Sequence, residues 1–400
     1  MAIRRSPDDF LVEERLGEAY RASLAERRSE ERRHAVFRLE KTSLTTPEAI
    51  AHLGRAFRAR GDAIGYAGLK DRHARTIQHV SIALPAKAED MAFRGAGGPS
   101  WTATWLGWSD RQLAAEAIDG NRFTIVVRGL AHAEAEAMAT RAARLARGGD
   151  LLVANYFGDQ RFGSARHGQG FAARALVRGR FDEALKLLVG TPFRRDHGAT
   201  RVLNRLAAEH WGDWKRIVDG LRPMPERRAF EVLAAGGDFR EAFATLPPFT
   251  QLMCVEAYQS HLWNETVRRL VRSTLPVAAI VRTANPFGEL LFPTAGTLPA
   301  GWDAMEIPLL APKSELAEPW GPFAQGTLDA EGVALADLRI PGLRRPFFGE
   351  ARRPLLARVG SFDLSPATAD DATAGRIQRT ARFDLPRGAY ATVVLRALGQ

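Results

Sequence analysis

The segment Gly65–Gln78, which reads GYAGLKDRHARTIQ, gathers glycine and polar residues between an apolar helical stretch and a β-patterned stretch. Loops in this position commonly present reactive groups from a rigid scaffold. Asp71 lies in the segment between Lys70 and Arg72, and two adjacent cations favour the ionised form of a carboxyl group. An ionised carboxylate can act as a nucleophile or as a general base. Composition alone leaves the alternative of a surface turn with solvated charges.

Other chemistry is poorly represented in the chain. No G-x-S-x-G, H-E-x-x-H or G-x-x-x-x-G-K-[ST] motif occurs. Cys254 is the single cysteine, which excludes an intramolecular disulfide and leaves too few thiolates for a cysteine zinc site. His73 and His79 have no paired carboxylates or cysteines nearby in the sequence, and we interpret them as exposed loop histidines. The sequence therefore predicts no metal site and no cofactor.

The charge balance favours a polyanionic partner. The 400 residues carry 56 Lys and Arg against 46 Asp and Glu, a net charge of +10. Ten basic residues lie between Gln160 and Arg205 against three acidic ones, so most of the excess is in one stretch. Such a distribution is typical of nucleic-acid binding. The chain has neither a charged-then-apolar leader nor a run of about 18 apolar residues, which predicts a cytoplasmic protein with no membrane span.

The elements that must position this chemistry are read from periodicity. Thr46 before Pro47 starts an amphipathic helix, and β-patterned stretches follow at His79–Leu84, Thr102–Trp108 and Phe123–Gly129. Beyond a further helix at 133–147 the chain becomes mostly helical, over 171–189, 227–246 and 248–272. From Pro276 we expect loops and short strands, and the last thirty residues again read as β. The fold class is therefore α+β, with a sheet interrupted by an insertion.

Several motifs together resemble one enzyme family. Gly68–Gln78 matches every fixed position of the G-x-K-D-x-x-A-x-T-x-Q signature of the TruD family of RNA pseudouridine synthases. Further family elements follow in order, and they are PDDFLVEE from Pro7, GNRF from Gly120, NYFGDQRFG from Asn155, AYQS from Ala257 and LPRGAYAT from Leu385. The resemblance spans nearly the whole chain and is weakest over 190–244 and 283–361.

The resemblance implies a fold and a site. The fold would be a mixed, largely antiparallel pseudouridine-synthase sheet flanked by helices, formed by residues 1–152 and by closing strands in 345–400. A mainly helical insertion domain would occupy 153–344. Asp71 would be the catalytic aspartate, acting as nucleophile or in a glycal-type route. Substrate-binding roles would fall to Arg4, Phe10, Glu14, Lys70, Gln78, Asn121, Phe123, Asn155 and Arg161.

Four of these assignments keep alternatives open, and Phe10 faces the same choice as Phe123 between base stacking and core packing. Arg4 would pair with Asp71 where the family more often has Lys, although the neighbouring Arg5 could take that place. Phe123 would stack on the extruded base, whereas its strand pattern alone indicates a core residue. Asn121 would bond a uracil edge or the loop backbone. Tyr156, Phe157 and Phe162 are better interpreted as packing residues than as nucleotide-stacking ones.

The resulting hypothesis is an isomerase that converts a uridine of tRNA, by resemblance uridine 13, to pseudouridine as a monomer and without cofactor. The competing hypothesis is a tRNA-binding protein or RNA chaperone that uses the same basic cleft without turnover.

Overall fold

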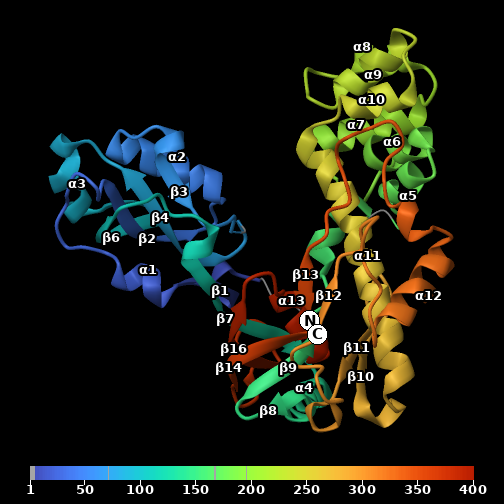
Figure 1. Ribbon diagram of the computed structural model, residues 1–400. Helices are drawn as coiled ribbons and strands as arrows, with labels where there is room; N and C mark the ends of the chain where they lie inside the picture. The colour runs from blue at the N-terminus through green and yellow to red at the C-terminus, as the bar shows by residue number, and fades with distance from the viewer. Residues whose placement is uncertain (1–4, 71, 166–167, 195) are drawn as a thin grey trace. The chain divides into compact units, whose positions relative to one another are not determined.

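The computed structural model describes residues 5–70, 72–165, 168–194 and 196–400 (Figure 1). The chain forms two compact units, one made of residues 1–153 and 357–400 and the other of residues 154–356. The insertion domain was expected to end at residue 344, whereas the chain re-enters the first unit only at Ala357. Each unit is described by itself below.

The first unit is built on a sheet, and its strands come from both ends of the chain. Its strands are β1 (Phe10–Leu16), β2 (His34–Thr42), β3 (Ile64–Tyr66), β4 (Arg75–Ala83), β5 (Ala96–Gly98), β6 (Trp101–Ser109), β7 (Ile118–Leu130), β8 (Ala146–Arg147), β9 (Asp150–Ala154), β14 (Leu356–Leu364), β15 (Thr368–Ala369) and β16 (Ile377–Pro386). Its helices are α1 (Glu18–Ala22), α2 (Thr46–Phe57), α3 (Glu89–Arg94), α4 (His132–Leu145) and α13 (Ala391–Ala397).

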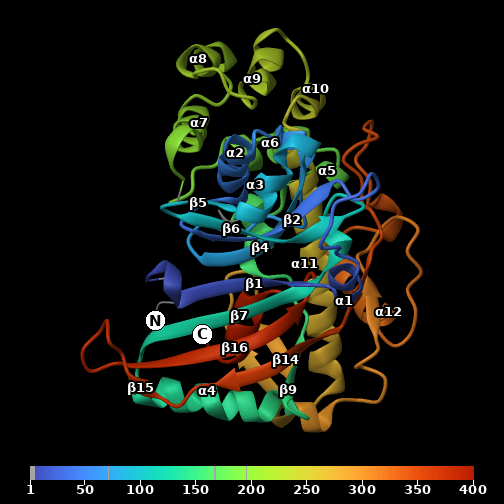
Figure 2. The same cartoon turned by 90° about the vertical axis from the view of Figure 1, so that its left-hand side faces the viewer.

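Strand β1 lies at the middle of this sheet. The order over the described residues is β5-β6-β2-β4-β1-β7-β16-β14-β9-β8, with β3 on β4 and β15 on β16. Figure 2 shows β1, β7, β16 and β14 side by side in that order. The pairing of β1 with β7 is antiparallel and runs the length of β1, whereas its pairing with β4 is parallel and covers only Leu11 to Glu13. Strands β1 and β4 therefore separate beyond Glu13.

Helix α2 covers one face of the β2 and β4 half of the sheet. Thr45 caps its N-terminus by accepting the Glu48 N–H, and Glu48 returns a bond to the Thr45 N–H, so the first turn is closed on both sides. Ala49, Leu53 and Phe57 are buried at helical spacing and pack with Phe37 and Val80 of the strands. This packing fixes the start of α2, and Thr46 with it, over β4.

The second unit is mainly helical, with two small sheets. Its helices are α5 (Ala172–Val177), α6 (Phe181–Val189), α7 (Gly198–Glu209), α8 (Trp214–Gly220), α9 (Arg227–Ala234), α10 (Phe239–Ala244), α11 (Pro248–Thr274) and α12 (Gly321–Glu331). Its strands are β10 (Ile280–Thr283) with β11 (Leu290–Pro293), and β12 (Glu306–Pro308) with β13 (Arg352–Pro354). Helix α11 is the long yellow helix of Figure 1, and its buried positions span nearly its whole circumference.

Four sequence expectations about elements are wrong. The stretches 171–189 and 227–246 each form two helices, since Gly179 and Gly236 adopt positive φ angles of 72° and 88° that end a helix. The closing segment ends in helix α13 rather than in a strand, because Val393, Val394, Leu395 and Leu398 are all buried on a short helix. Helix α12 lies in the region expected to hold only loops and short strands.

Candidate active site

The loop before Asp71 is held by the start of helix α2. The Thr46 hydroxyl accepts the backbone N–H of Lys70 at 2.9 Å and donates its own proton to Oε1 of Gln78 at 3.0 Å. Thr46 and Gln78 are both fully buried. A single hydroxyl thus connects the loop, the helix and strand β4. Asp71 itself, the predicted catalytic residue, lies outside the described residues.

Lys70 and Glu14 form a buried ion pair at the point where β1 and β4 separate. Lys70 Nζ lies 2.7 Å from Glu14 Oε1, and the two side chains are 13% and 1% exposed. Glu14 Oε2 accepts the backbone N–H of His79 at 2.8 Å, which replaces the strand-to-strand bond that is missing there. Burial by itself raises the pKa of Glu14, but the contacts with His79 and Lys70 outweigh it, and the pKa lies below the ordinary value of 4.5.

The predicted base-binding residues share one face of the sheet. Val12 lies opposite Phe123 across β1 and β7 and opposite Thr76 across β1 and β4. Because strand side chains alternate with a period of two, Asn121 and Gln78 lie on this same face.

Three buried polar atoms on this face have no hydrogen-bond partner among the described residues, and they are Thr76 Oγ1, Gln78 Nε2 and Asn121 Oδ1. Such atoms are rare in folded proteins and mark a place where a ligand or water completes the bonding.

Phe123 lies at the edge of an aromatic cluster. Its ring is stacked on Phe383 at a centroid distance of 5.5 Å and meets the edge of Phe10 at 6.2 Å. Phe123 is 9% exposed and Phe383 1%. The ring therefore packs in the core, as the strand pattern indicates, and its stacking on a base stays a prediction.

A second buried network fixes the chain just before β1. Asp9 accepts the backbone N–H groups of Arg5 and Ser6 at 3.0 Å, and Arg128 of β7 binds it at 2.7 Å. Burial raises the pKa of Asp9, but these bonds lower it further than burial raises it. The guanidinium of Arg5 binds the Ala372 carbonyl at 2.9 Å and the Thr373 hydroxyl. Arg4 lies outside the described residues.

Sequence reasoning missed Thr46, Asp9 and Arg128 as residues that hold the site. Asp9 carried a signal, because it belongs to the DF element. Thr46 was recognised only as a helix start, and Arg128 carried no signal, since its partners Asp9 and Asp370 are distant in the sequence. His79, interpreted as an exposed loop residue, instead lies in β4 and is 8% exposed. That interpretation is wrong because the strand begins at Arg75.

A cavity of about 890 Å³ lies where β1 and β4 separate, and Glu13, Arg15, Arg38 and Arg122 are among its lining residues. Glu13 and Arg15 point to the sheet face opposite Phe123, because they alternate with Val12 and Glu14. Arg122 pairs with Asp384 at 2.8 Å on that opposite face. These residues therefore line the cavity from the face opposite Phe123, while Glu14, which also lines it, belongs to the Phe123 face.

Asn155 and Arg161 belong to the second unit. Both amide atoms of Asn155 are bonded, Nδ2 to the Pro354 carbonyl at 3.1 Å and Oδ1 to Arg353 at 2.7 Å. Arg161 pairs with Glu256 of α11 at 2.8 Å.

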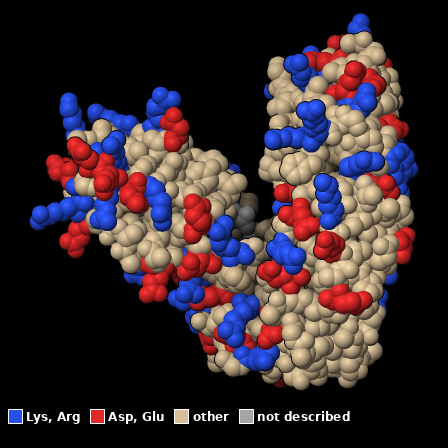
Figure 3. Space-filling model, in the orientation of Figure 1, with Lys and Arg blue, Asp and Glu red and all other residues tan. Residues whose placement is uncertain are grey.

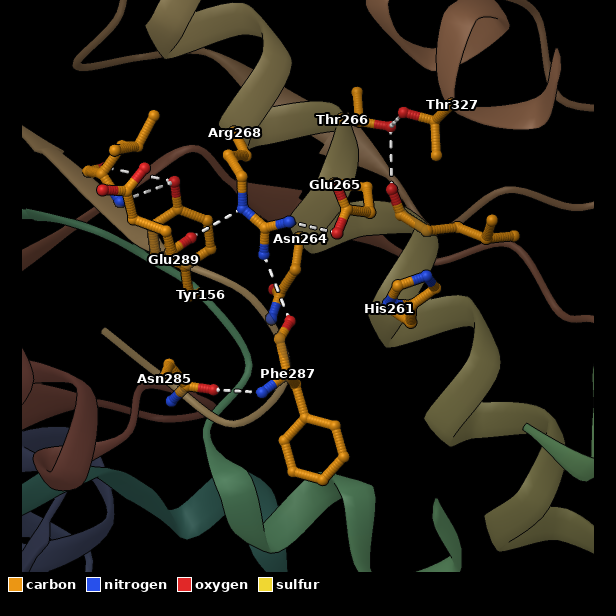
Figure 4. A network of polar contacts seen from close by, with 12 residues as sticks. Tyr156, His261, Asn264, Glu265, Thr266, Arg268, Asn285, Phe287, Glu289 and Thr327 are labelled. Carbon is orange, nitrogen blue, oxygen red and sulfur yellow. Dashed lines mark hydrogen bonds and ion pairs between the residues drawn. The ribbon is translucent and has the colours of Figure 1, made fainter. Parts of the chain in front are cut away.

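The aromatic residues of the same motif are buried, as the packing interpretation expects. Asn264 of α11 bonds both the N–H and the carbonyl of Phe157, and the Tyr156 hydroxyl donates to the Leu291 carbonyl at 3.1 Å. Figure 4 shows Tyr156 and Asn264 in this polar network, together with Arg268 and its bond to the Glu289 carbonyl.

The basic stretch from Gln160 to Arg205 is partly neutralised within the second unit. Arg174 pairs with Glu331 at 3.0 Å, and Arg180 pairs with Glu183 at 2.8 Å. On the face drawn in Figure 3, blue and red side chains are interspersed rather than separated. The net charge of the stretch therefore overstates the number of cations that are available to a polyanion.

Comparisons with known proteins agree with the motifs. A family model described as tRNA pseudouridine synthase D (TruD) matches residues 1–284. A probable tRNA pseudouridine synthase D of Methanopyrus kandleri is 32% identical over 91% of this chain and 85% of its own length. A tRNA pseudouridine synthase D of Aquifex aeolicus is 30% identical over 99% and 97%.

Among solved structures, the putative tRNA pseudouridine synthase D of Methanosarcina mazei superposes with a TM-score of 0.73, covering 99% of this chain and 92% of that one at 24% identity. That superposition confirms the expected α+β fold. No helix among the described residues is long and apolar enough to cross a membrane.

Proposed function

Since the chain belongs to the tRNA pseudouridine synthase D family, and is thereby an RNA pseudouridine synthase that isomerises uridine in tRNA, we propose that Asp71 is its catalytic carboxylate. The supporting observation is the anchoring of the preceding residue. Lys70 is bound through its backbone to Thr46 and through its ammonium group to Glu14, so the loop leading to Asp71 has a fixed start.

The base-binding face supports this assignment. The reaction breaks the N1–C1′ bond of uridine, turns the base and forms a C5–C1′ bond; the C5 proton is lost and N1 takes up a proton, so the composition does not change. Asp71 serves either as nucleophile at the sugar or as base in a glycal-type route. Phe123 stacks on the extruded base, and the unpartnered Gln78 Nε2 and Asn121 Oδ1 complement the carbonyl and N–H groups of the uracil edge.

Arg4 is the better partner for Asp71 than Arg5. The guanidinium of Arg5 is already bonded to the Ala372 carbonyl and the Thr373 hydroxyl. Asp9 accepts the backbone N–H of Arg5, the residue next to Arg4 in the sequence. Arg4 at the active site would stay charged and offer a bidentate pair to the carboxylate.

The remaining assignments are proposals of different kinds. Glu14 and Lys70 bind one another, which favours a positioning role over direct contact with the substrate. Phe10 supports Phe123 from its edge. Asn155 and Arg161 are proposed to shape the RNA-binding surface of the second unit from behind, since their polar groups are bonded internally. Uridine 13 as the target, the monomeric state and the cytoplasmic location stay predictions.

The test is the Asp71→Asn variant. We expect it to bind tRNA within about twofold of the parent and to release no tritium from C5-labelled uridine in tRNA, because the amide is neither a base nor a nucleophile. Asp90→Asn, on the exposed side of α3, is the matched control and should retain full turnover. Tritium release by Asp71→Asn at the control's rate would refute the assignment. Transcripts that differ only at position 13 would identify the target uridine.

A further inference from the structure

The second unit has a groove between the start of α11 and the segment before β13. Its volume is about 660 Å³, and it is referred to here as the α11 groove. Its lining includes Leu252, Leu309, Arg345, Phe347, Glu256 and Glu350. The side chains of Leu252 and Phe347 are unusually exposed for their type, at 44% and 62%. An apolar surface of this kind, with charged groups at its border, is typical of a binding site.

The segment that presents Phe347 is fixed by its neighbours. Phe348 is 4% exposed and packs against Tyr258 of α11. The Gly349 carbonyl accepts a bond from Gln259 at 2.9 Å, and Glu350 accepts one from the Ser314 hydroxyl at 2.6 Å. Because three consecutive residues are anchored, the Phe347 ring is held outward on an ordered backbone.

The Phe347 ring lies close to the backbone of its own segment but stays largely open to solvent. A Cβ placed on Gly349 would lie 3.4 Å from Cε2 of Phe347, while the residue as a whole is 62% exposed. The open part of the ring is therefore available to an apolar partner from outside the chain.

Within the part of the chain that the structure describes, the α11 groove has one cation in its lining that is not paired with a carboxylate. Glu256 is paired with Arg161 at 2.8 Å, whereas Glu350 accepts a hydrogen bond from the Ser314 hydroxyl and keeps its negative charge. That cation is Arg345, which is exposed and forms no ion pair with any described residue. An exposed aromatic ring beside an unpaired arginine is a combination that binds single-stranded nucleic acid, through stacking of the base and contact with the phosphate.

We propose that the α11 groove binds an unpaired nucleobase of the tRNA other than the target uridine, with Phe347 stacking on the base and Arg345 contacting its phosphate. The inference rests on the proposed function for the nature of the ligand, but it makes no use of catalysis. The carboxylate of Glu350 is placed to accept a ribose 2′-hydroxyl, the group that distinguishes RNA from DNA.

The experiment is equilibrium binding of a tRNA transcript, which needs no turnover and so can fail independently of the Asp71 assignment. We expect Phe347→Ala to raise Kd about tenfold, since loss of one stacked base corresponds to about 1.4 kcal/mol. Phe347→Trp should bind like the parent because it keeps a stacking ring. Phe249→Ala is the matched control, because Phe249 of α11 is 72% exposed but does not line the groove.

Two further readouts separate stacking from other roles. Arg345→Gln should reduce the slope of log Kd against log salt by about 0.7–0.9, the contribution of one phosphate contact. In steady-state assays Phe347→Ala should raise KM and leave kcat unchanged, because the groove holds the RNA and takes no part in the reaction. A tRNA Kd for Phe347→Ala equal to that of Phe249→Ala would overturn the proposal. Loss of self-association in Phe347→Ala at unchanged tRNA affinity would also overturn it and would identify a protein interface.

Discussion

The Glu14→Gln variant tests whether the buried ion pair positions the catalytic loop. The Glu14 carboxylate accepts bonds from two donors, Lys70 Nζ at 2.7 Å and the His79 N–H at 2.8 Å. A glutamine amide has one acceptor oxygen, so one of these donors loses its partner. Breaking a fully buried pair costs about 3–5 kcal/mol. Because the Lys70 side chain stays 13% exposed and the introduced glutamine keeps one hydrogen bond, we expect the free energy of unfolding to fall by about 2–3 kcal/mol.

The assay is thermal unfolding together with tritium release. The first unit has about 200 residues, for which 1 kcal/mol shifts Tm by about 2–4 °C, so the unfolding transition of this unit should fall by about 4–12 °C. We also expect kcat to fall about 100-fold, the effect of misplacing a catalytic group by about 1 Å. Glu13→Gln is the control, since it makes the same chemical change one residue earlier at a half-buried position without an ion pair. Equal Tm and kcat values for the two variants would refute the positioning role.

The same comparison has a defined pH dependence. The pKa of Glu14 in the folded protein is lower than its ordinary value of 4.5, so the ionised carboxylate stabilises the fold above about pH 4.5. This contribution is lost as the pH falls through the folded-state pKa. The Tm difference between the parent and Glu14→Gln should therefore be constant near neutrality and shrink below about pH 4.5. A difference that grows on acidification would contradict the assigned ion pair.

Two further predictions address residues around the loop. Thr46→Val should lower the free energy of unfolding by about 1–3 kcal/mol and reduce kcat at unchanged tRNA Kd, because the Lys70 N–H and Gln78 Oε1 lose their shared hydroxyl. Unfolding curves and single-turnover rates measure these two effects, and an unchanged kcat would contradict the prediction. Phe123→Leu should reduce kcat/KM by about 10–100-fold, because the base loses its stacking partner. The change in Tm should be small because leucine still packs on Phe383. A large loss of Tm with kcat/KM near that of the parent would show that Phe123 is only a core residue.

Local sequence patterns were sufficient to predict a helix or a strand where apolar residues recur with a simple period. The start of α2 was readable because Thr45, Thr46 and Pro47 satisfy or dispense with the first N–H groups of the helix. Strands β4, β6 and β7 were readable from their apolar alternation. The closing helix α13 was misread because its apolar run is buried on nearly all sides, and a short run of that kind has no period that separates a helix from a strand.

The site residues likewise divide into those that the sequence could predict and those that only the packing of distant segments reveals. Motif resemblance singled out Gln78, Asn121 and Phe123, but their common face follows only from the register in which β1, β4 and β7 pair. The sequence could not show that Glu14 and Lys70 bind one another, or that Arg5 is committed to Ala372, since both are contacts between distant segments.

By itself, then, the sequence determined the residue types, their order and the local conformations that short-range hydrogen bonding and burial period dictate. The tertiary structure alone decided which polar groups find hydrogen-bond partners within the chain. Asn155 has both amide atoms bonded, while Gln78 keeps its amide nitrogen without a partner among the described residues, although both are amide side chains in motifs that resemble the family's. The physical reason is that a side-chain hydrogen bond depends on how separate segments pack, which no local pattern encodes.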